Sequence, residues 1–322
     1  MFTDMTESEL QSYRSAQTLP EDFSEFWGST LAESRGLGGD VSVSKVETGL
    51  ATIDVYDVTF PGFGGDPIRA WLRVPAGATG PLPTVVQFVG YGGGRGRPWA
   101  ELFWASAGFA HFHMDTRGQG GNWSVGDTPD NGGSGGPQFA GVMTRGILSR
   151  EDYYYRRLIT DAVRAVDAAA GLSLVDASRI AVRGNSQGGA LALAASALSP
   201  QVRAVAAGVP FLADFPRATV ITNALPFREI GEFLKVHREK VAQVHDTLRY
   251  FDTVNFARNS STPAYYSAAL MDAVTPPSTV FGAFHEHRGP KSMTVWPYNG
   301  HEAGDVDEEP LILDFLRREL DL

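Results

Sequence analysis

The feature that most constrains this fold is a set of short apolar runs that alternate with longer segments of helical spacing. The apolar runs lie at 84–89, 108–114, 180–182, 202–209, 264–271 and 293–296. The helical segments lie at 97–106, 153–170, 187–198, 214–224, 276–286 and 308–320. Because a strand that is apolar along its whole length must be covered on both faces, the alternation predicts a mostly parallel sheet with helices on both faces, the α/β class.

The region before residue 83 follows two other patterns. Residues 7–35 show two helical patterns, which predict an N-terminal helical extension packed against the main domain. Segments 51–60 and 68–74 alternate apolar and polar residues on either side of a turn rich in glycine. They predict antiparallel strands at the start of the sheet.

Residues 226–258 do not fit the alternation of strands and helices. They hold charged helical segments at 229–240 and 241–250, with no strand between them. We interpret them as a small helical insertion over the carboxyl edge of the sheet, in the position of a lid, although an ordinary pair of surface helices explains the pattern equally well. The chain has 322 residues and no internal repeat, so we expect a single domain over 1–322.

Composition excludes several classes of function. The net charge is −10 and the pI is about 5.2, whereas nucleic acids and anionic membranes need partners with clustered Lys and Arg. The absence of cysteine excludes disulfides, thiolate catalysis and Cys-ligated zinc. The acidic N-terminal sequence lacks the pattern of a secretory signal, and no apolar stretch reaches the roughly 18 residues of a membrane span, so we expect a cytoplasmic protein.

The pattern G-x-S-x-G occurs twice in the sequence. At 132–136 it lies in a Gly-rich loop, with no strand before it and no helix after it. At 184–188 a short apolar strand comes before it and an Ala- and Leu-rich helical segment follows. A nucleophile elbow needs this strand–turn–helix arrangement, in which the helix N-terminus faces the developing oxyanion. The context therefore predicts an α/β-hydrolase fold with Ser186 as nucleophile, and it disfavours Ser134.

A nucleophilic serine needs a base and an acid that orients the base. In the α/β-hydrolase fold these residues follow in the chain order Ser, Asp or Glu, then His. His301 follows the last predicted strand across a short loop, and Asp272 follows the strand before it. We therefore expect both side chains at the same edge of the sheet as Ser186.

The other histidines and the nearby aspartates have ordinary structural explanations. Of His111 and His113, in a strand before the serine, we expect one to point inward as a structural residue. We expect the histidines of the insertion to be solvated, and those that end the helical segment 276–286 to act as favourable cations at its C-terminus. The residues concerned are His237 and His245, then His285 and His287, and, as weaker alternatives for the acid, Asp252, Asp305 and Asp307.

Two backbone amides must hold the oxyanion in this fold. One belongs to the residue after the nucleophile, Gln187, and the other comes from the loop after an early parallel strand. The Gly-rich loop 90–94 occupies that position, and Tyr91 is the candidate within it, although a simple Gly-rich turn also explains the loop. This chemistry requires no metal and no organic cofactor.

Several segments form a recognisable set. Three short ones are Arg117-Gly118-Gln119, Gly184-x-Ser186-Gln187-Gly188 and His301-Glu302, and longer ones lie at 22–27, 114–120, 208–214 and 271–280. Together, in order and spacing, they resemble carbohydrate esterase family 7, the acetyl xylan esterase and cephalosporin-C deacetylase family. The similarity covers nearly the whole chain.

The resemblance implies the same triad of Ser186, Asp272 and His301, with the same two oxyanion donors. It also implies roles for residues around the triad: Arg117, Gln119 and Glu302 as braces, and Tyr91, Phe211, Pro226 and Val274 as the lining of a small acyl pocket. It further implies a cytoplasmic homo-hexamer that deacetylates small sugars and antibiotics, such as acetylated xylo-oligosaccharides and cephalosporin C. A serine peptidase of the same fold, an esterase for longer acyl chains and a non-catalytic binding protein are the alternatives.

Overall fold

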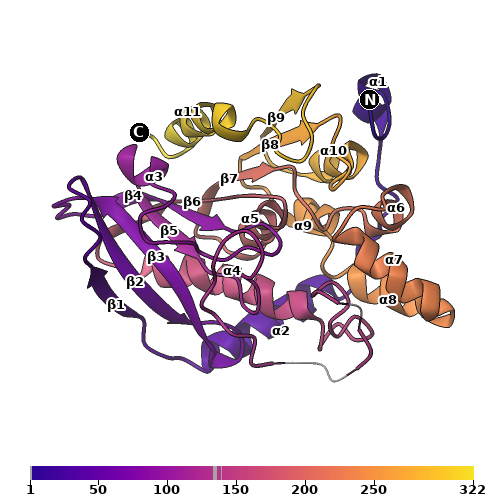
Figure 1. The fold of residues 1–322 in the computed structure, drawn as a ribbon, viewed down its shortest axis with the longest axis horizontal. Coiled ribbons are helices and arrows are strands. Elements are labelled where there is room, and N and C mark those ends of the chain that lie inside the picture. The colour runs from indigo at the N-terminus through magenta and orange to yellow at the C-terminus, as the bar shows by residue number, and fades with distance from the viewer. Residues whose placement is uncertain (1, 133–135, 139) are drawn as a thin grey trace.

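A nine-stranded sheet with helices on both faces makes up the computed structural model, which describes residues 2–132, 136–138 and 140–322 (Figure 1). The strands are β1 (Ser42–Val46), β2 (Ile53–Pro61), β3 (Pro67–Pro75), β4 (Leu82–Phe88), β5 (Ala110–Met114), β6 (Val175–Asn185), β7 (Val202–Gly208), β8 (Ala264–Ala269) and β9 (Lys291–Trp296). Ser134, the serine of the second G-x-S-x-G pattern, lies outside the described residues.

The helices surround this sheet and fill the connections between its strands. They are α1 (Glu7–Ser12), α2 (Phe23–Gly36), α3 (Phe103–Ser106), α4 (Tyr154–Ala170), α5 (Gln187–Leu198), α6 (Phe215–Ile221), α7 (Phe227–Val236), α8 (Val241–Leu248), α9 (Thr253–Asn259), α10 (Pro277–Glu286) and α11 (Glu309–Glu319). Short 3-10 helices accompany them in the described residues: η1 (Phe63–Gly65), η2 (Arg238–Lys240) and η3 (Asp305–Glu308).

The strand order in the sheet is β1-β2-β3-β5-β4-β6-β7-β8-β9. The pairs from β1 to β5 are antiparallel, and the pairs from β5 through β4 to β9 are parallel. This confirms the predicted mostly parallel sheet with antiparallel N-terminal strands. After β4 the chain forms β5 on one side of it and then returns to form β6 on the other side. The carboxyl ends of β4 and β6 therefore flank a topological switch point, where open α/β sheets bind their ligands.

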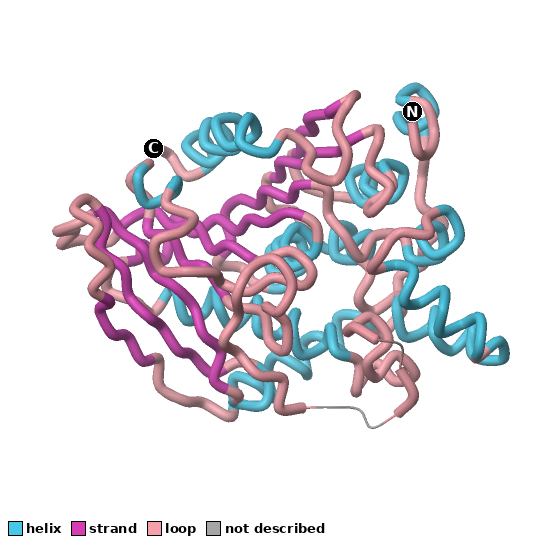
Figure 2. Tube along the Cα trace, in the orientation of Figure 1, coloured by secondary structure: helices cyan, strands magenta, loops and turns pink. Residues whose placement is uncertain are grey.

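The parallel strands bury both of their faces, as their continuous apolar sequences predict. Neighbouring residues of a strand point to opposite sides. Val86 and Val182 accordingly belong to the larger apolar core, which includes residues of α2, α4, α5 and α9. Val85 and Ala181 belong to a second core, on the side of α3 and α11. Figure 2 shows helices on both sides of the strands.

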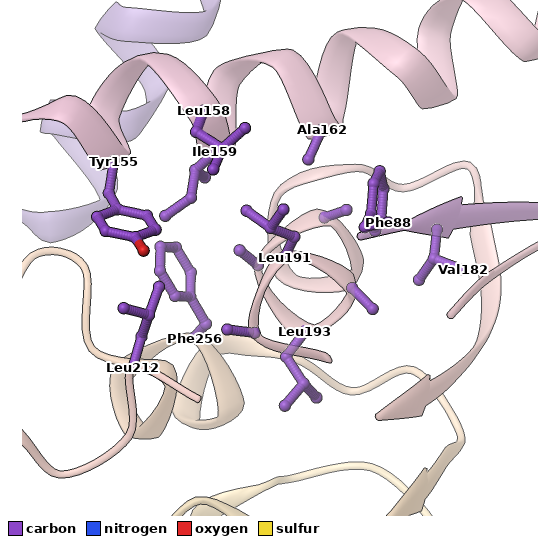
Figure 3. Close-up of a cluster of buried hydrophobic side chains, with 14 of the residues drawn as sticks. Phe88, Tyr155, Leu158, Ile159, Ala162, Val182, Leu191, Leu193, Leu212 and Phe256 are labelled. Carbon is purple, nitrogen blue, oxygen red and sulfur yellow. The ribbon is translucent and has the colours of Figure 1, made fainter. Parts of the chain in front are cut away.

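Helix α5, which follows Ser186, is enclosed on several sides. It is apolar around most of its circumference, which is typical of a buried helix. Figure 3 shows Leu191 of α5 beside Leu158 and Ile159 of α4, with Phe256 of α9 on the other side of the cluster. Because neighbours on several sides hold α5, its N-terminus is fixed relative to the sheet.

Some predicted boundaries are wrong. The segment 97–106 is helical only at Phe103–Ser106, because the side chain of Arg73 binds backbone carbonyl groups at the start of the segment. The buried guanidinium donates hydrogen bonds to the carbonyl oxygens of Arg97 and Pro98, both at 3.1 Å, and turns replace the helix there. Strand β6 is much longer than the apolar run 180–182, and α6 ends before the predicted 224.

Residues 226–258 contain α7, η2, α8 and nearly all of α9, with no strand among them. In Figure 1, α7 and α8 project beside α6, on the side of the molecule away from β1. Helix α7 turns Phe227, Ile230 and Phe233 into the main apolar core. The insertion therefore packs against the domain through one face of α7, and α8 and α9 add Val244, Leu248, Val254 and Phe256 to the same core.

The prediction that only one of His111 and His113 points inward is wrong. Both side chains are buried, and their rings stack with centroids 5.4 Å apart. The reason is the strand period: residues two apart point to the same face of a sheet. Nε2 of His111 lies 3.1 Å from Oε1 of Gln87, and Nδ1 of His113 lies 3.4 Å from a guanidinium nitrogen of Arg73.

This histidine pair predicts a loss of stability in acid. Burial, followed by the charge of Arg73, holds the pKa of both His111 and His113 well below the usual value. In the unfolded chain a histidine ionises near pH 6.5. As the pH falls below about 6.5, the unfolded state binds protons that the native state does not, so the free energy of unfolding decreases.

Urea denaturation at pH 7.5 and pH 5.5 measures this effect. We expect the wild type to lose stability between the two pH values, and a His111→Gln variant to lose less. Glutamine keeps a donor for Gln87 and does not titrate. His237→Gln, at the end of α7, is the control and should follow the wild type. An unchanged pH dependence in His111→Gln would contradict the explanation.

Candidate active site

Ser186 occupies a sharp turn between β6 and α5. Its backbone has φ 57° and ψ −121°, a region that residues with a side chain rarely adopt. The turn also needs glycine on both sides. A Cβ at Gly184 would overlap the backbone of Gly188, and a Cβ at Gly188 would overlap the carbonyl of Phe88. The turn thus holds the serine at the N-terminus of α5, at the carboxyl edge of the sheet.

The serine meets a histidine and an aspartate from two later loops. Nε2 of His301 lies 3.0 Å from Oγ of Ser186, and Nδ1 of His301 lies 2.8 Å from Oδ2 of Asp272. Asp272 follows β8 and His301 follows β9, and these neighbouring parallel strands end at the same edge of the sheet. With Nδ1 protonated toward the aspartate, Nε2 is free to accept the serine proton.

The carboxylate of Asp272 is buried and receives several donors. The amides of Val274 and Thr275 donate to Oδ1 at 2.7 and 2.9 Å, and the Thr275 hydroxyl donates to Oδ2 at 2.6 Å. From the N-terminal extension, the hydroxyl of Thr3 donates to the Asp272 carbonyl at 2.8 Å. Since an ionised carboxylate has about four acceptor positions, these donors and His301 together fix its orientation.

The amides of Tyr91 and Gln187 are the predicted oxyanion donors. Neither amide has an acceptor within the described part of the chain. The segments that carry them are in contact, because the Gln187 side chain donates to the carbonyl of Val89 at 3.1 Å and Gly188 packs on Phe88. Two free N–H groups therefore lie on adjoining segments at the switch point, one of them directly after the serine.

Gln119 bridges these two segments. Its Oε1 accepts from the amide of Gly92 at 2.6 Å, and its Nε2 donates to Oε1 of Gln187 at 3.0 Å. Nε2 also donates to the hydroxyl of Tyr154 on α4 at 2.9 Å. A single amide side chain thus ties the Gly-rich loop to the residue after the serine.

Arg117 lies in a buried ion network. It donates through two nitrogens to Asp161 of α4, at 2.8 Å for the Nη2–Oδ1 pair, and to Asp66 at 3.0 Å. Its carbonyl accepts from the Tyr154 hydroxyl at 2.6 Å, and the same hydroxyl contacts Gln119. Arg117 therefore anchors the loop after β5, and Gln119 with it.

Glu302 lies on the surface beside His301. Its Oε1 accepts from the amide of Gly300 at 3.1 Å and from the side chain of Asn299 at 3.2 Å. The carbonyl of Asn299 in turn accepts from the amide of Met271 at 3.1 Å. Glu302 thus shapes the loop that carries His301, and among the described residues its side chain makes no hydrogen bond with the serine.

Two of the three remaining residues that we expect to line the pocket contact Ser186 or Asp272 directly. The amide of Phe211 donates to the Ser186 carbonyl at 3.0 Å, and the amide of Val274 donates to the Asp272 carboxylate. The buried Pro226 is connected to them through its neighbour Phe227, whose ring packs on Phe211 with centroids 4.4 Å apart. These residues come from the loop after β7, the residue before α7 and the loop after β8.

The structure adds Glu229 of α7, which the sequence reasoning missed. Its side chain is buried, with 3% of the residue exposed, and Oε1 accepts from the Tyr91 hydroxyl at 2.6 Å. Burial raises the pKa of the Glu229 carboxyl, and the bonds from Tyr91 and from the amide of Met143 oppose that shift. The charged segment 229–240 suggested a solvated face. The apolar neighbours Phe227, Ile230 and Phe233 are the signal that could have placed Glu229 on the buried side.

The alternative residues have structural positions. Asp252 caps α9 by accepting from the amide of Val254 at 2.9 Å, and burial raises its pKa to about 6. Asp305 and Asp307 are exposed, as expected. His237 and His245 are only partly exposed. Burial lowers the pKa of both His285 and His287, which disfavours the charged form that we expected at the end of this helix.

Known proteins share this architecture over nearly the whole chain. A family model described as acetyl xylan esterase (AXE1) matches residues 1–319. The acetyl esterase Axe7A of Xylanibacter ruminicola is 30% identical over 289 residues, which are 88% of this chain and 63% of that protein. The chain thus spans less than two thirds of the length of this curated relative.

Two solved structures are similar along their full length. The acetyl xylan esterase from Paenibacillus sp. R4 is 37% identical, with a TM-score of 0.92, and the match covers 98% of this chain and 99% of that one. Acetyl xylan esterase 1 from Thermoanaerobacterium sp. JW/SL YS485 is 30% identical, with a TM-score of 0.90 and the same coverage. The chain belongs to the acetyl xylan esterase family of carboxylic ester hydrolases, as its sequence motifs predicted.

Proposed function

We propose that the chain is a serine esterase that removes acetyl groups from small acetylated sugars such as acetylated xylo-oligosaccharides. The observation that carries the proposal is the line from Ser186 through His301 to Asp272, with contacts of 3.0 and 2.8 Å. The two free amides on adjoining segments add the second requirement of acyl transfer, a site for the oxyanion. Membership of the acetyl xylan esterase family supports acetyl as the acyl group.

The proposed reaction has two steps. Oγ of Ser186 attacks the acetyl carbonyl carbon while Nε2 of His301 takes the hydroxyl proton, and Asp272 stabilises the resulting imidazolium. The amides of Tyr91 and Gln187 bind the oxyanion. The C–O bond to the sugar then breaks, His301 gives its proton to the leaving alkoxide, and an acetyl-enzyme remains. Water attacks this ester while His301 takes one of its protons; acetic acid leaves with the other, and His301 returns its proton to Oγ of Ser186.

We further propose that Tyr91, Phe211, Pro226 and Val274 line a pocket for a small acyl group. In this proposal the chain is one α/β-hydrolase domain over 1–322, and the insertion 226–258 supplies one wall of the pocket. Bulky aromatic rings support the size limit, because Phe211 packs against both Phe227 and Tyr91, with ring centroids 4.4 and 6.5 Å apart.

Three finer proposals rest on the family resemblance. Cephalosporin C is a second substrate, since it also carries an acetyl ester, and the protein is a homo-hexamer that works in the cytoplasm. No helix in the described ranges is long and apolar enough to cross a bilayer. Light scattering distinguishes a hexamer from the 34.7 kDa protomer, and cell fractionation tests the location.

Initial rates on p-nitrophenyl acetate, butyrate and octanoate test the acyl-chain preference. We expect kcat/KM to be highest for acetate and to fall as the chain lengthens, because a small pocket cannot hold the added methylenes. A profile that rises toward octanoate would refute the acetyl proposal and favour a long-chain esterase. Comparison with the matched p-nitroanilide measures the alternative of a peptidase, which would cleave the amide as well as the ester.

A further inference from the structure

Glu229 is a buried carboxyl group without a cationic partner among the described residues. Its two oxygens accept from the Tyr91 hydroxyl at 2.6 Å and from the amide of Met143 at 3.0 Å. The carboxyl group also lies against Gly141, where a Cβ would overlap it. Burying an acid without an opposite charge is costly, and an apolar side chain would attach α7 to the domain at lower cost. The contact with Tyr91 is therefore the feature that needs an explanation.

Tyr91 is held at several points around its free amide. Its hydroxyl donates to Glu229 and accepts from the amide of Val142 at 2.9 Å, so both polar positions of the phenol are used. Its carbonyl accepts from the indole N–H of Trp123 at 2.8 Å, and its ring meets the ring of Phe211 edge to face. The backbone N–H is the one hydrogen-bonding group of Tyr91 left without an acceptor in the described structure.

The loop around Tyr91 has little stiffness of its own. Glycine stands at 90, 92, 93 and 94, and glycine permits many backbone conformations. An oxyanion donor must stay within about 0.5 Å of its productive position. Tyr91 is the residue of this loop that carries a side chain before Arg95, and its phenol adds a side-chain contact to the backbone contacts that Gln119 and Trp123 make with the loop.

We infer that Glu229 is a positioning residue for the oxyanion hole: by binding the Tyr91 hydroxyl from α7, it holds the Tyr91 amide in the direction that the oxyanion requires. The inference rests on the proposed function, since it deepens the role of the same site. It also assigns a function to the insertion 226–258. Phe227 of α7 packs against Phe211 of the proposed pocket, and Glu229 of the same helix binds the residue that carries the amide donor, Tyr91. One helix thus couples the acyl pocket to the oxyanion hole.

Steady-state kinetics of Glu229→Ala on p-nitrophenyl acetate test the inference. We expect kcat to fall about ten- to hundredfold with KM changed less than about threefold, because misplacing one donor weakens binding of the transition state more than binding of the substrate. Glu232→Gln, which removes a carboxylate elsewhere on α7, is the control. Glu232 lies on the same helix and pairs with Arg228 and Lys235 at the surface, so this variant should keep the wild-type kcat.

A double-mutant cycle shows whether Glu229 acts through the phenol. Tyr91→Phe deletes the hydroxyl and keeps the ring and the amide. We expect Tyr91→Phe to lower kcat to a similar extent as Glu229→Ala. In the Tyr91→Phe background, Glu229→Ala should lower kcat by less than about a further twofold. Should Glu229→Ala fail to fold, Tyr91→Phe breaks the same contact from the other side. A wild-type kcat in folded Glu229→Ala or in Tyr91→Phe, or fully additive losses, would overturn the inference.

Crystal structures of Glu229→Ala and Tyr91→Phe give a readout that does not depend on activity. We expect the Tyr91 amide to move by more than about 0.5 Å relative to the Gln187 amide, and to stay in place in Glu232→Gln. An unmoved amide in both variants would overturn the inference whatever the kinetics. A folded wild type without esterase activity would refute the proposed function instead, and the amide positions would still decide the role of Glu229.

Discussion

A Ser186→Ala variant is expected to lose about 10⁴- to 10⁶-fold in kcat on p-nitrophenyl acetate while remaining folded. The hydroxyl oxygen of Ser186 is the atom that would bond to the acetyl group in the acetyl-enzyme. Nε2 of His301 lies 3.0 Å from this oxygen, and without the hydroxyl there is no proton at this position for it to take. Alanine removes the nucleophile and leaves the turn intact, because the backbone of residue 186 already has its strained φ of 57° with a Cβ present. The measurements are kcat and the melting temperature. We expect kcat to fall whatever the value of KM, and the melting temperature to stay unchanged.

Ser196→Ala is the control for this loss. Ser196 lies on the same helix α5, and its buried hydroxyl contacts the carbonyl of Leu193 at 2.9 Å and the hydroxyl of Ser260 at 3.0 Å. The same substitution there should cost stability and keep the turnover of the folded protein. Full activity in Ser186→Ala, or failure of an organophosphonate to label the folded wild type at this serine, would remove Ser186 as the nucleophile.

An Asp272→Asn variant should lose about 10³- to 10⁴-fold in kcat, although it changes only one oxygen to an NH₂ group. The carboxylate accepts from two amides, a hydroxyl and His301. Asparagine offers one acceptor oxygen and must turn a donor toward another donor. If the NH₂ group faces His301, the imidazole places its proton on Nε2, which then cannot accept the proton of Ser186.

The measurement is kcat with acetate release, compared with Asp252→Asn. Asp252 is equally buried and also accepts backbone amides, but its partners belong to α9, α6 and the N-terminal extension. That variant is expected to lower the melting temperature and to keep kcat in the folded protein. An Asp272→Asn enzyme within tenfold of the wild type would show that Asp272 does not orient His301.

The sequence alone determined the architecture, because its signals are local. Continuous apolar runs define strands that must be covered on both faces, and this predicts the parallel sheet. Steric overlap between Gly184, Gly188 and the end of β4 requires glycines at fixed spacing around Ser186, so the five-residue pattern located the turn once the apolar strand before it and the helical segment after it were considered. The order of strands then indicated which edge would hold Asp272 and His301, since the carboxyl ends of parallel strands meet at one edge.

Tertiary structure alone decided the contacts between distant segments. Glu229 meets Tyr91 across 138 positions of the chain, and Gln119 meets Gln187 across 68. Arg73 also makes contacts between distant segments: it donates hydrogen bonds to the carbonyls of Arg97 and Pro98, and these bonds prevent the predicted helix. In each case a long polar side chain binds a polar group on a segment that is distant in the sequence. Neither local propensity nor periodicity records such a partner, because the cost of burial appears only when the segments are packed together.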